Sequence, residues 1–584
     1  MGTISDKLMR IINTKEDIRQ ALISKGYDVP TSIPFKEYAK MILDLPCKVD
    51  SFPDIEGIVA RYSASGLTNE QMAANPVWVD KTGNGHDIQL KNFSWKGMSG
   101  VGGYEMNFNL WRNNVSSIPD ISMSTTTTSV SVSVGNSTYN NNLIYIHISN
   151  WDINKNHWLK VTSTYEDGDL AFIFYNDSNT KKIGLPANGY VNILAYPEFK
   201  GSYMYISTIS NKQGSFTIEQ LPLYPGALVF DGVDDYGVCE NFPILTKEKG
   251  YTVVVLRQWD QDFLNTTLTG GLLSTRNYST GEGVAFEKIE SSNKGYWNLG
   301  AGGIIDFAKS PFTWQTSKQY NNVGILKGDK NHGKPLCVGC GLSGGQQCGR
   351  FAIWELVFLD HDATEEELTK IKDYFVKTYP WLFPDKVWTV TGKTNEDEDR
   401  ATIANITGNG NDLVLSNFGF AEGSGYNEEG EYAGYLVTDG VDDKIISSIF
   451  KMGNDWTVIG DWELINTGKN DNAGIVKFDS IVIYNYNYNY NSMLINIKNG
   501  RNILIPDQNT VNAICSDGRI YSKDWKESIY NEETESTSKN FLTIGYSGNA
   551  YTKIAFKNLA IYPTVLSRED CIKAYNYLQT LKAK

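Results

Sequence analysis

Six aspartates stand in two groups of the same spacing and could bind a metal ion. The first group lies in DGVDDYG at 231–237 and the second in DGVDDKI at 439–445. Clustered carboxylates on a loop supply the hard oxygen ligands that Ca²⁺ prefers. Aspartate side chains also accept hydrogen bonds from nearby backbone N–H groups, which closes a tight turn without an ion. The spacing therefore predicts either a calcium site or a structural turn at Asp231, Asp234, Asp235, Asp439, Asp442 and Asp443.

A run of alternating tyrosine and asparagine spans 484–490. Alternate residues of a strand share a face, so a strand here would place all four tyrosines on one side. Such a face could bind the apolar side of sugar rings, pack against a neighbouring subunit, or belong to a solvated strand. An exposed run of this kind favours aggregation, which indicates a partner. The candidate glycan-binding residues are Tyr484, Tyr486, Tyr488 and Tyr490.

Signatures of catalysis are weak. The five histidines lie away from any Ser or Cys nucleophile motif, and neither GxSxG nor HExxH occurs. Glycoside cleavage needs two carboxylates beside the scissile bond, and no Glu-x-Asp-x-x-Glu triplet is present. The densest acidic cluster, 396–399, precedes a turn and is typical of solvated surface. We expect a protein that is not an enzyme, although carboxylates from distant segments could still meet in the fold.

Three segments of the chain occur twice. TGNGHDIQLKNFSW at 82–95 resembles 407–420, the aspartate motif recurs as above, and RFAIWELVFLD with the following helix at 350–375 resembles 553–578. The first pair is separated by 325 residues and the second by 208, so the first copy holds about 117 additional residues. The pattern predicts a duplicated module with a further domain inserted into the first copy.

The repeat also bears on a group of cysteines. Residues 336–348 contain three cysteines, two of them as Cys-x-x-Cys, a spacing that zinc sites and redox motifs share. LCVGC at 336–340 aligns with LTIGY at 542–546, where tyrosine replaces the last cysteine. We therefore expect these cysteines at ordinary strand positions, with zinc and redox chemistry as alternatives.

The segments between the repeats complete the layout. Residues 52–384 are predicted to form the first β-sandwich module, interrupted at 107–222 by a small β-sandwich of alternating strands, and 385–584 form the second module. Each module should end in a capped helix, the first with a Thr364–Glu367 capping box.

The first 46 residues have helical rather than strand periodicity. Two short amphipathic helices there could pack on the next domain or dock the chain to another protein. The residues that would form the apolar face are Ile18, Leu22, Phe35, Tyr38 and Ile42.

Composition excludes several classes of protein. The formal net charge is −14 and the pI is about 5.0, which disfavours binding to nucleic acid. Seven scattered cysteines fit folding in a reducing cytosol rather than a disulfide scaffold. The start of the chain shows no apolar signal segment, and no apolar run is long enough to predict a membrane span.

The repeated pieces resemble the laminin-G-like branch of the concanavalin A-like lectin/glucanase superfamily, which often carries an Asp-Gly-x-Asp-Asp turn and closes with a strand and a capped helix. The stretch TKEDIRQALISKGYDVPTSIPFKEYAKMI, at 14–42, resembles the amino-terminal segment of structural proteins from tailed phages that infect Bacteroidales. Together these resemblances imply a mainly β virion fibre or decoration protein, made in the host cytoplasm.

The resemblance also implies partners. Residues 1–46 would dock to other virion proteins, the sandwiches would bind host cell-surface glycan, and related fibres are trimers. Relatives of this fold often bind Ca²⁺, so no cofactor is certain and calcium is the candidate that the resemblance implies. The alternatives are a polysaccharide depolymerase, a pure virion scaffold and a bacterial surface adhesin.

Overall fold

The computed structural model describes most of the chain after residue 51. The described residues are 52–113, 121–135, 146–147, 157–175, 180–193, 199, 203–208, 213–246, 248–264, 266–275, 285–289, 294–297, 304–306, 323–327, 335–342, 346–408, 410–430, 432–450, 452–465, 474–478, 481–486, 492–497, 501–505, 511–522, 525, 527–529, 542–547 and 550–583. The expected helical hairpin at 1–46 and its apolar residues Ile18, Leu22, Phe35, Tyr38 and Ile42 lie outside them, so the docking prediction stays a prediction.

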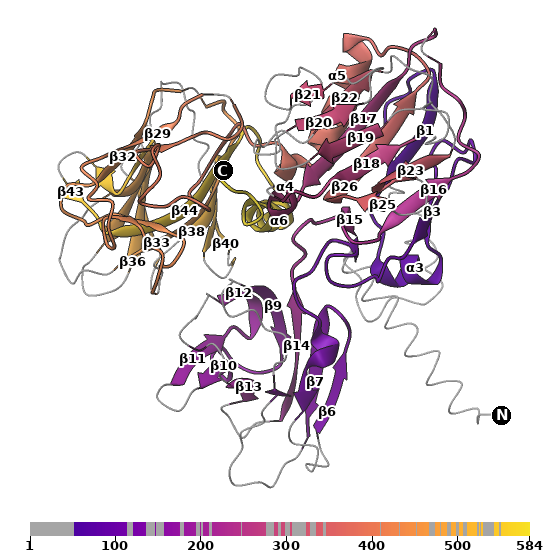
Figure 1. The fold of residues 1–584 in the computed structure, drawn as a ribbon. Coiled ribbons are helices and arrows are strands. Elements are labelled where there is room, and N and C mark those ends of the chain that lie inside the picture. Colours follow the sequence, from indigo (N-terminus) through magenta and orange to yellow (C-terminus); the bar gives the residue numbers. More distant parts are fainter. Residues whose placement is uncertain are drawn as a thin grey trace, which may run out of the picture. The chain divides into compact units, whose positions relative to one another are not determined.

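The first module is a pair of sheets around one core (Figure 1). In the first sheet β26 is central and bonds to β1, β15 and β17; its strands are β1 (Ile58–Ser63), β4 (Gly100–Val101), β15 (Leu228–Asp231), β17 (Thr252–Trp259), β22 (Val323–Lys327) and β26 (Arg350–Leu359).

The second sheet of this module contains β2 (Val77–Trp78), β3 (Ile88–Lys91), β16 (Tyr236–Cys239), β18 (Gly270–Ser274), β19 (Ala285–Ile289), β20 (Lys294–Trp297), β21 (Ile304–Asp306), β23 (Leu336–Val338), β24 (Cys340–Leu342) and β25 (Gln346–Cys348). Apolar side chains of both sheets share one buried cluster, for example Val253 and Phe351 with Ile88 and Leu273. Burial of such a core is the main stabilising term of a sandwich.

The described residues between β4 and β15 form ten strands of an inserted domain, whose two five-stranded sheets enclose a separate core. The first sheet contains β5 (Arg112–Asn113), β8 (Ile146–His147), β10 (Leu170–Tyr175), β11 (Thr180–Leu185) and β13 (Tyr203–Thr208). The second contains β6 (Ile121–Thr125), β7 (Ser129–Val134), β9 (His157–Ser163), β12 (Asn188–Ile193) and β14 (Gly214–Gln220). In β7 the valines are more buried than the alternating serines, as expected of a strand with one core face.

The second module repeats the first. Its first sheet contains β27 (Lys386–Thr389), β30 (Gly425–Tyr426), β31 (Leu436–Val437), β33 (Thr457–Leu464), β38 (Val511–Cys515), β39 (Arg519–Ser522), β40 (Glu527–Ile529) and the central β44 (Ile554–Tyr562). Its second sheet contains β28 (Thr402–Ile403), β29 (Leu413–Ser416), β32 (Lys444–Ser447), β34 (Gly474–Phe478), β35 (Ile481–Tyr486), β36 (Ser492–Ile497), β37 (Arg501–Ile505) and β41 (Thr543–Ile544), with β42 (Tyr546–Ser547) and β43 (Ala550–Tyr551) as a separate pair.

The two modules agree in register as well as in strand order. β17 pairs with β26 and β33 with β44, and both pairings shift by one residue in mid-strand, after Leu256 and after Asp461. This places Glu355 and Asn558 at the same position of the two central strands, because each faces the residue before the shift. The predicted fold class, mainly β and built from sandwiches, is confirmed.

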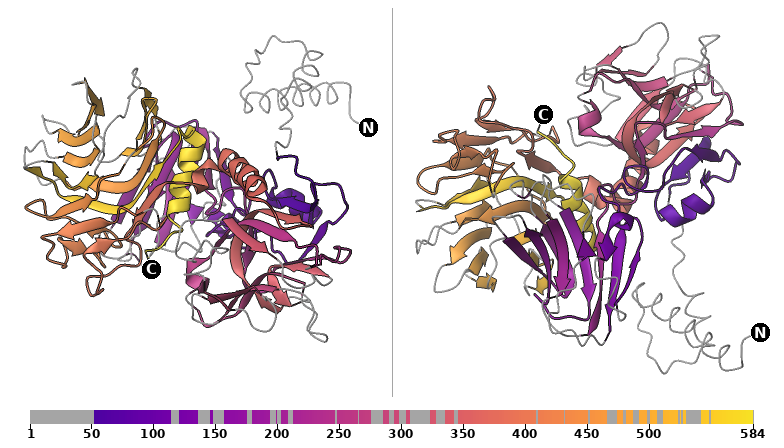
Figure 2. Two further views of the ribbon diagram at one scale, coloured as in Figure 1. Left: turned by 90° about the horizontal axis from the view of Figure 1, so that it is seen from above. Right: turned by 60° about the horizontal axis from the view of Figure 1, so that its bottom comes forward.

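Short helices complete the modules. They are α3 (Asn69–Ala74), α4 (Gln261–Leu264), α5 (Glu365–Thr378) and α6 (Arg568–Leu578), with 3₁₀ turns η1 (Phe108–Leu110) and η3 (Pro380–Leu382). The Thr364–Glu367 capping box of α5 is confirmed, and Ser567 caps α6, which lies against β33 (Figure 2). In the part of the chain that the structure describes, no helix is long and apolar enough to cross a membrane.

Candidate functional site

The DGVDD segments are closed turns held by their own aspartates. In the first module Asp231 Oδ1 accepts from the N–H groups of Val233 and Asp234, at 2.8 and 3.4 Å. The Asp235 carboxylate accepts from Asp231 N–H at 3.0 Å and from the Ser99 hydroxyl at 2.9 Å. Two of the three carboxylates are therefore engaged in shaping the turn.

The second module builds the same turn from Asp439 and Asp443. Asp439 Oδ1 accepts from Val441 N–H at 2.7 Å, and Asp443 Oδ2 accepts from Asp439 N–H at 2.7 Å. Ser424 takes the place of Ser99, with its hydroxyl 3.1 Å from Asp443 Oδ1. The turn is thus a structural part of the repeat.

Burial governs the protonation of the inner aspartate in each turn. Desolvation, followed by the neighbouring Asp231, raises the pKa of Asp235 to about 7. Desolvation likewise raises the pKa of Asp443 to about 6. A carboxyl that retains its proton near neutral pH is a poor Ca²⁺ ligand, and the hydrogen bonds account for both turns without an ion.

The three aspartates of each turn nevertheless lie close enough together to bind one calcium ion. In each group, Asp231, Asp234 and Asp235 or Asp439, Asp442 and Asp443, one oxygen per residue lies within 4.8 Å of the others. Calcium therefore stays a prediction at these turns.

The tyrosine run is described only in part. Tyr484 and Tyr486 belong to β35, where they pair with Leu494 and Ser492 of β36. Tyr488 and Tyr490 lie outside the described residues. Glycan binding at this run stays a prediction.

The cysteines near 340 occupy strands, as expected. Cys337, Cys340 and Cys348 lie in β23, β24 and β25, and all three are buried free thiols in a small apolar cluster with Val238. Their alignment with the second copy therefore indicated their position correctly.

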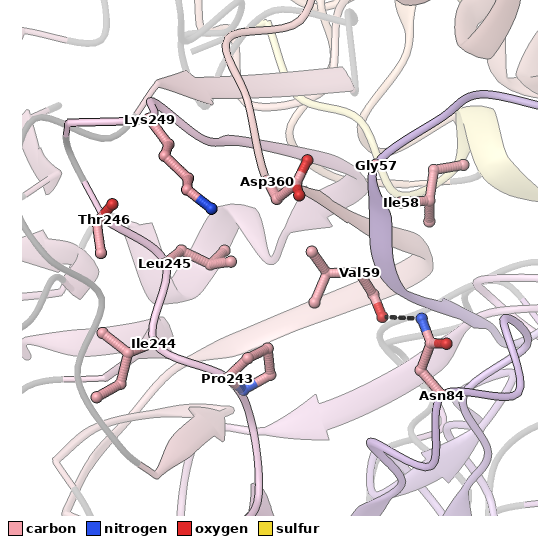
Figure 3. Close-up of a pocket in the computed structure, with 10 residues that line it drawn as sticks. All are labelled: Gly57, Ile58, Val59, Asn84, Pro243, Ile244, Leu245, Thr246, Lys249 and Asp360. Atoms are coloured by element: carbon pink, nitrogen blue, oxygen red, sulfur yellow. Dashed lines mark hydrogen bonds between the residues drawn. The ribbon is translucent and has the colours of Figure 1, made fainter.

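A cavity of about 390 Å³ opens at one end of the first module, where four separate segments meet (Figure 3). They are the start of β1, the loop before β3, the loop between β16 and β17, and the end of β26. The lining residues are Gly57, Ile58, Val59, Asn84, Pro243, Ile244, Leu245, Thr246, Lys249 and Asp360. We call this cavity the β1 pocket.

Irregular backbone shapes the β1 pocket. The pairing of β1 with β26 shifts between Ile58 and Ala60, and this bulge leaves the Val59 carbonyl free to accept from the Asn84 side chain at 2.9 Å. Bulges often occur beside functional sites because they redirect one residue out of the ladder. Asn84 lies between two glycines with positive φ, Gly83 and Gly85, so the TGNG turn holds its amide at the edge of the cavity.

Gly57 is required where it stands. Its φ is +81°, and a Cβ there would collide with Asp360 Oδ1 and lie 2.7 Å from His361 Nδ1. The Gly57 carbonyl accepts from Asp360 N–H at 3.0 Å, which fixes the Asp360 backbone across the pocket from Lys249.

The pocket contains a positively charged and a negatively charged side chain beside an apolar wall. Lys249 and Asp360 are both exposed and line the same pocket (Figure 3). The apolar wall contains Ile244, which is 57% exposed, together with Pro243 and Leu245. Such a lining suits an amphipathic ligand that has one apolar face and hydroxyl groups at its edge.

His361 lies beside two carboxylates at this pocket, those of Asp360 and Glu367. Its ring nitrogens lie 3.2 Å from Asp360 Oδ1 and 3.2 Å from Glu367 Oε1. Desolvation opposes protonation, but the hydrogen bonds to Asp360 and Glu367 outweigh it and raise the pKa of His361. The contact between the His361 ring and Asp360 Oδ1 holds the Asp360 carboxylate in place.

Sequence reasoning missed this pocket. Its polar residues come from segments that are nearly 300 positions apart, each contributing one or two side chains. The TGNG motif was the one local pattern among these segments, and it indicated a turn rather than a pocket.

Comparisons with known proteins assign no family to the chain. No family model matches it, and no curated protein matches it. Among solved structures, the binding domain of botulinum neurotoxin serotype D is similar over 60% of this chain and 89% of its own, with 12% identity and a TM-score of 0.22. A serotype D domain in complex with N-acetylneuraminic acid covers 58% of this chain and 87% of its own, with 10% identity and a TM-score of 0.23.

The sialidase of Trypanosoma rangeli, solved in complex with sialic acid, covers 80% of this chain and 85% of its own, with 9% identity and a TM-score of 0.22. TM-scores of this size do not establish a common fold. The assignment of sandwiches rests on the sheets and cores of the chain itself.

Proposed function

We propose that this chain is a non-enzymatic virion protein that binds host-surface glycan through the β1 pocket. The observation that carries the proposal is the lining of that pocket: an ammonium, a carboxylate and an amide stand beside an exposed apolar wall. Sugars present that combination, with hydroxyl groups around an apolar ring face. The pocket is open and held by a rigid sandwich, which suits adhesion to an extended polymer.

The composition of the pocket supports binding rather than hydrolysis. Glycoside cleavage uses two carboxylates about 5–10 Å apart. Among the ten lining residues, Asp360 alone carries a carboxylate, and the ring of its neighbour His361 lies 3.2 Å from it. We therefore propose that the sugar is held and not cleaved.

Attachment to the particle is assigned to residues 1–46, on the strength of their resemblance to phage structural proteins. Single sugar sites are weak, and several copies on one particle would raise the avidity through effective concentration. A homotrimer, as in related fibres, would supply such copies.

The test is binding of the purified chain to an array of host capsular and surface polysaccharides. Lys249→Met should lower the apparent affinity about tenfold by removing a charged donor, whereas Lys370→Met should leave it unchanged. Lys370 is the matched control because it is an exposed lysine on α5, paired with Glu366 at 2.8 Å.

Three other results would decide against the proposal. New reducing ends after incubation with capsule would indicate a depolymerase. Stable incorporation into virions without binding to any glycan would indicate a scaffold. Incorporation of a chain that lacks residues 1–46 would refute the docking assignment.

A further inference from the structure

A second cavity, also about 390 Å³, lies in the second module. Its floor contains Val437, Tyr432 and Ile465, which belong to one apolar cluster with Tyr435 and Ala555. Its polar residues are Lys553, Glu422 and Asn427. We call this cavity the β44 pocket, because Lys553 directly precedes β44.

The β44 pocket occupies the place where the first module carries the inserted domain. Asn427 N–H donates to Tyr435 O at 2.8 Å, and Gly102 N–H donates to Ala227 O at 2.8 Å, so Asn427 and Gly102 are equivalent. Ile465 N–H donates to Lys553 O at 3.0 Å, as Asp260 N–H donates to Arg350 O at 3.0 Å.

The flanks of the insertion fill this space in the first module. A Cβ on Gly102 would lie 2.9 Å from Pro222 and 3.3 Å from the Tyr104 hydroxyl. One on Gly103 would lie 3.2 Å from Tyr224, which is buried. The second module has no insertion here, so the equivalent space stays open as a cavity.

The two copies differ in one further respect, the partner of the basic residue. In the first module Arg350 forms an ion pair with Asp260 at 3.5 Å. In the second module Ile465 occupies the position of Asp260, so Lys553 lacks the carboxylate that pairs with Arg350. The Ile465 side chain adds apolar surface to the pocket floor. Lys553 is half-buried and forms no ion pair with any residue that the structure describes.

We propose that the β44 pocket binds a carboxylated sugar, such as a hexuronic acid residue of a polysaccharide. The sugar carboxylate replaces the missing acid and pairs with Lys553. The ring face packs on Tyr432 and Ile465, and the hydroxyl groups bond to Glu422 and Asn427. This site is separate from the β1 pocket, so either can fail without the other.

The test is calorimetric titration of the full chain with an oligogalacturonate and with its methyl ester, which has the same skeleton without charge. The acid should bind and the ester should bind at least about tenfold more weakly, because a charge-assisted pair is lost. Lys553→Met keeps the aliphatic stem and should also weaken binding of the acid about tenfold.

Ile465→Asp is the second variant, since it restores the acid that the first module has. Its carboxylate should pair with Lys553 and compete with the ligand, so binding of the acid should fall as in Lys553→Met. Lys370→Met, on α5 and outside both pockets, is the matched control and should leave this binding unchanged. The melting curves of all three variants check that they fold.

Equal binding of the acid and its ester would overturn the proposal, as would no measurable binding at millimolar concentration. Unchanged binding in Lys553→Met would overturn it even if Ile465→Asp fails to fold. Binding that is lost only in Lys249→Met would assign the ligand to the β1 pocket instead.

Discussion

The buried ion pair of the first module gives the sharpest test of the structure. Glu355 of β26 is fully buried, and Arg61 of β1 is 4% exposed. Arg61 Nε lies 3.1 Å from Glu355 Oε2, and a second guanidinium nitrogen lies 3.3 Å from Oε1. The Tyr379 hydroxyl donates to Glu355 at 2.8 Å, and Arg61 donates to the Tyr374 hydroxyl at 2.8 Å.

We expect either single substitution to be costly. Arg61→Met leaves a buried carboxylate without its counter-ion, and Glu355→Gln leaves a buried guanidinium, each at a cost of about 3–5 kcal/mol of unfolding free energy. Arg61→Met with Glu355→Gln together removes both charges and should cost less than about 2 kcal/mol. The second module shows that a neutral central strand is compatible with this fold, because Asn558 stands at the Glu355 position.

The protonation of Glu355 adds a pH dependence. Desolvation, only partly offset by Arg61, already raises the pKa of Glu355. Without Arg61 the folded protein should hold this proton still more tightly than the unfolded chain. The stability deficit of Arg61→Met should therefore grow as the pH rises above the ordinary pKa of an unfolded glutamate, about 4.3.

The assay is urea unfolding at several pH values, followed by hydrogen exchange of peptides from β26. Peptides from β44 serve as an internal control, because the second module lacks this ion pair. A coupling energy between the two substitutions below about 0.5 kcal/mol would refute the reasoning. Equal loss of protection in β26 and β44 would do so as well.

Three further outcomes follow from the turns and caps. Asp235→Asn should reduce the loss of first-module stability that occurs as the pH rises from about 4 to 7, because the folded carboxyl keeps its proton to about pH 7 and the unfolded one does not. Melting curves at several pH values check this, with exposed Asp234→Asn as the control that should leave the pH dependence unchanged. Gly57→Ala should cost about 1–2 kcal/mol from its positive φ and should displace Asp360, measured as melting temperature and glycan affinity together; normal affinity would contradict it. Thr364→Ala should cost about 1 kcal/mol and speed hydrogen exchange in the first turn of α5, and unchanged exchange would contradict the cap.

The repeated features of this chain were predictable from sequence. The DGVDD motif indicated a turn, and the structure shows Asp235 and Asp443 closing equivalent turns. The spacing between Thr364 and Glu367 predicted a capping box, which local backbone geometry alone determines. Such features are visible because the interacting residues lie within five positions of one another.

The two pockets were not predictable for the opposite reason. Lys249 and Asp360 line one pocket only because β16 and β26 end, and β17 begins, at the same side of the sandwich. The lost partner of Lys553 becomes apparent only when Ile465 is matched to Asp260 through equivalent backbone hydrogen bonds. Neither relation leaves a local pattern in the sequence.

The inserted domain is joined to the first module at a single point, where both of its ends lie together. Its two ends leave the host on neighbouring backbone segments, since Leu223 N–H donates to Gly103 O at 3.0 Å and Tyr224 N–H donates to Gly102 O at 2.8 Å. The two ends of the insertion are thus adjacent in space. A domain of a different size could replace it by recombination without disturbing the strand pairing of the first module. The second module shows the equivalent junction without an inserted domain, where Asn427 N–H donates to Tyr435 O at 2.8 Å.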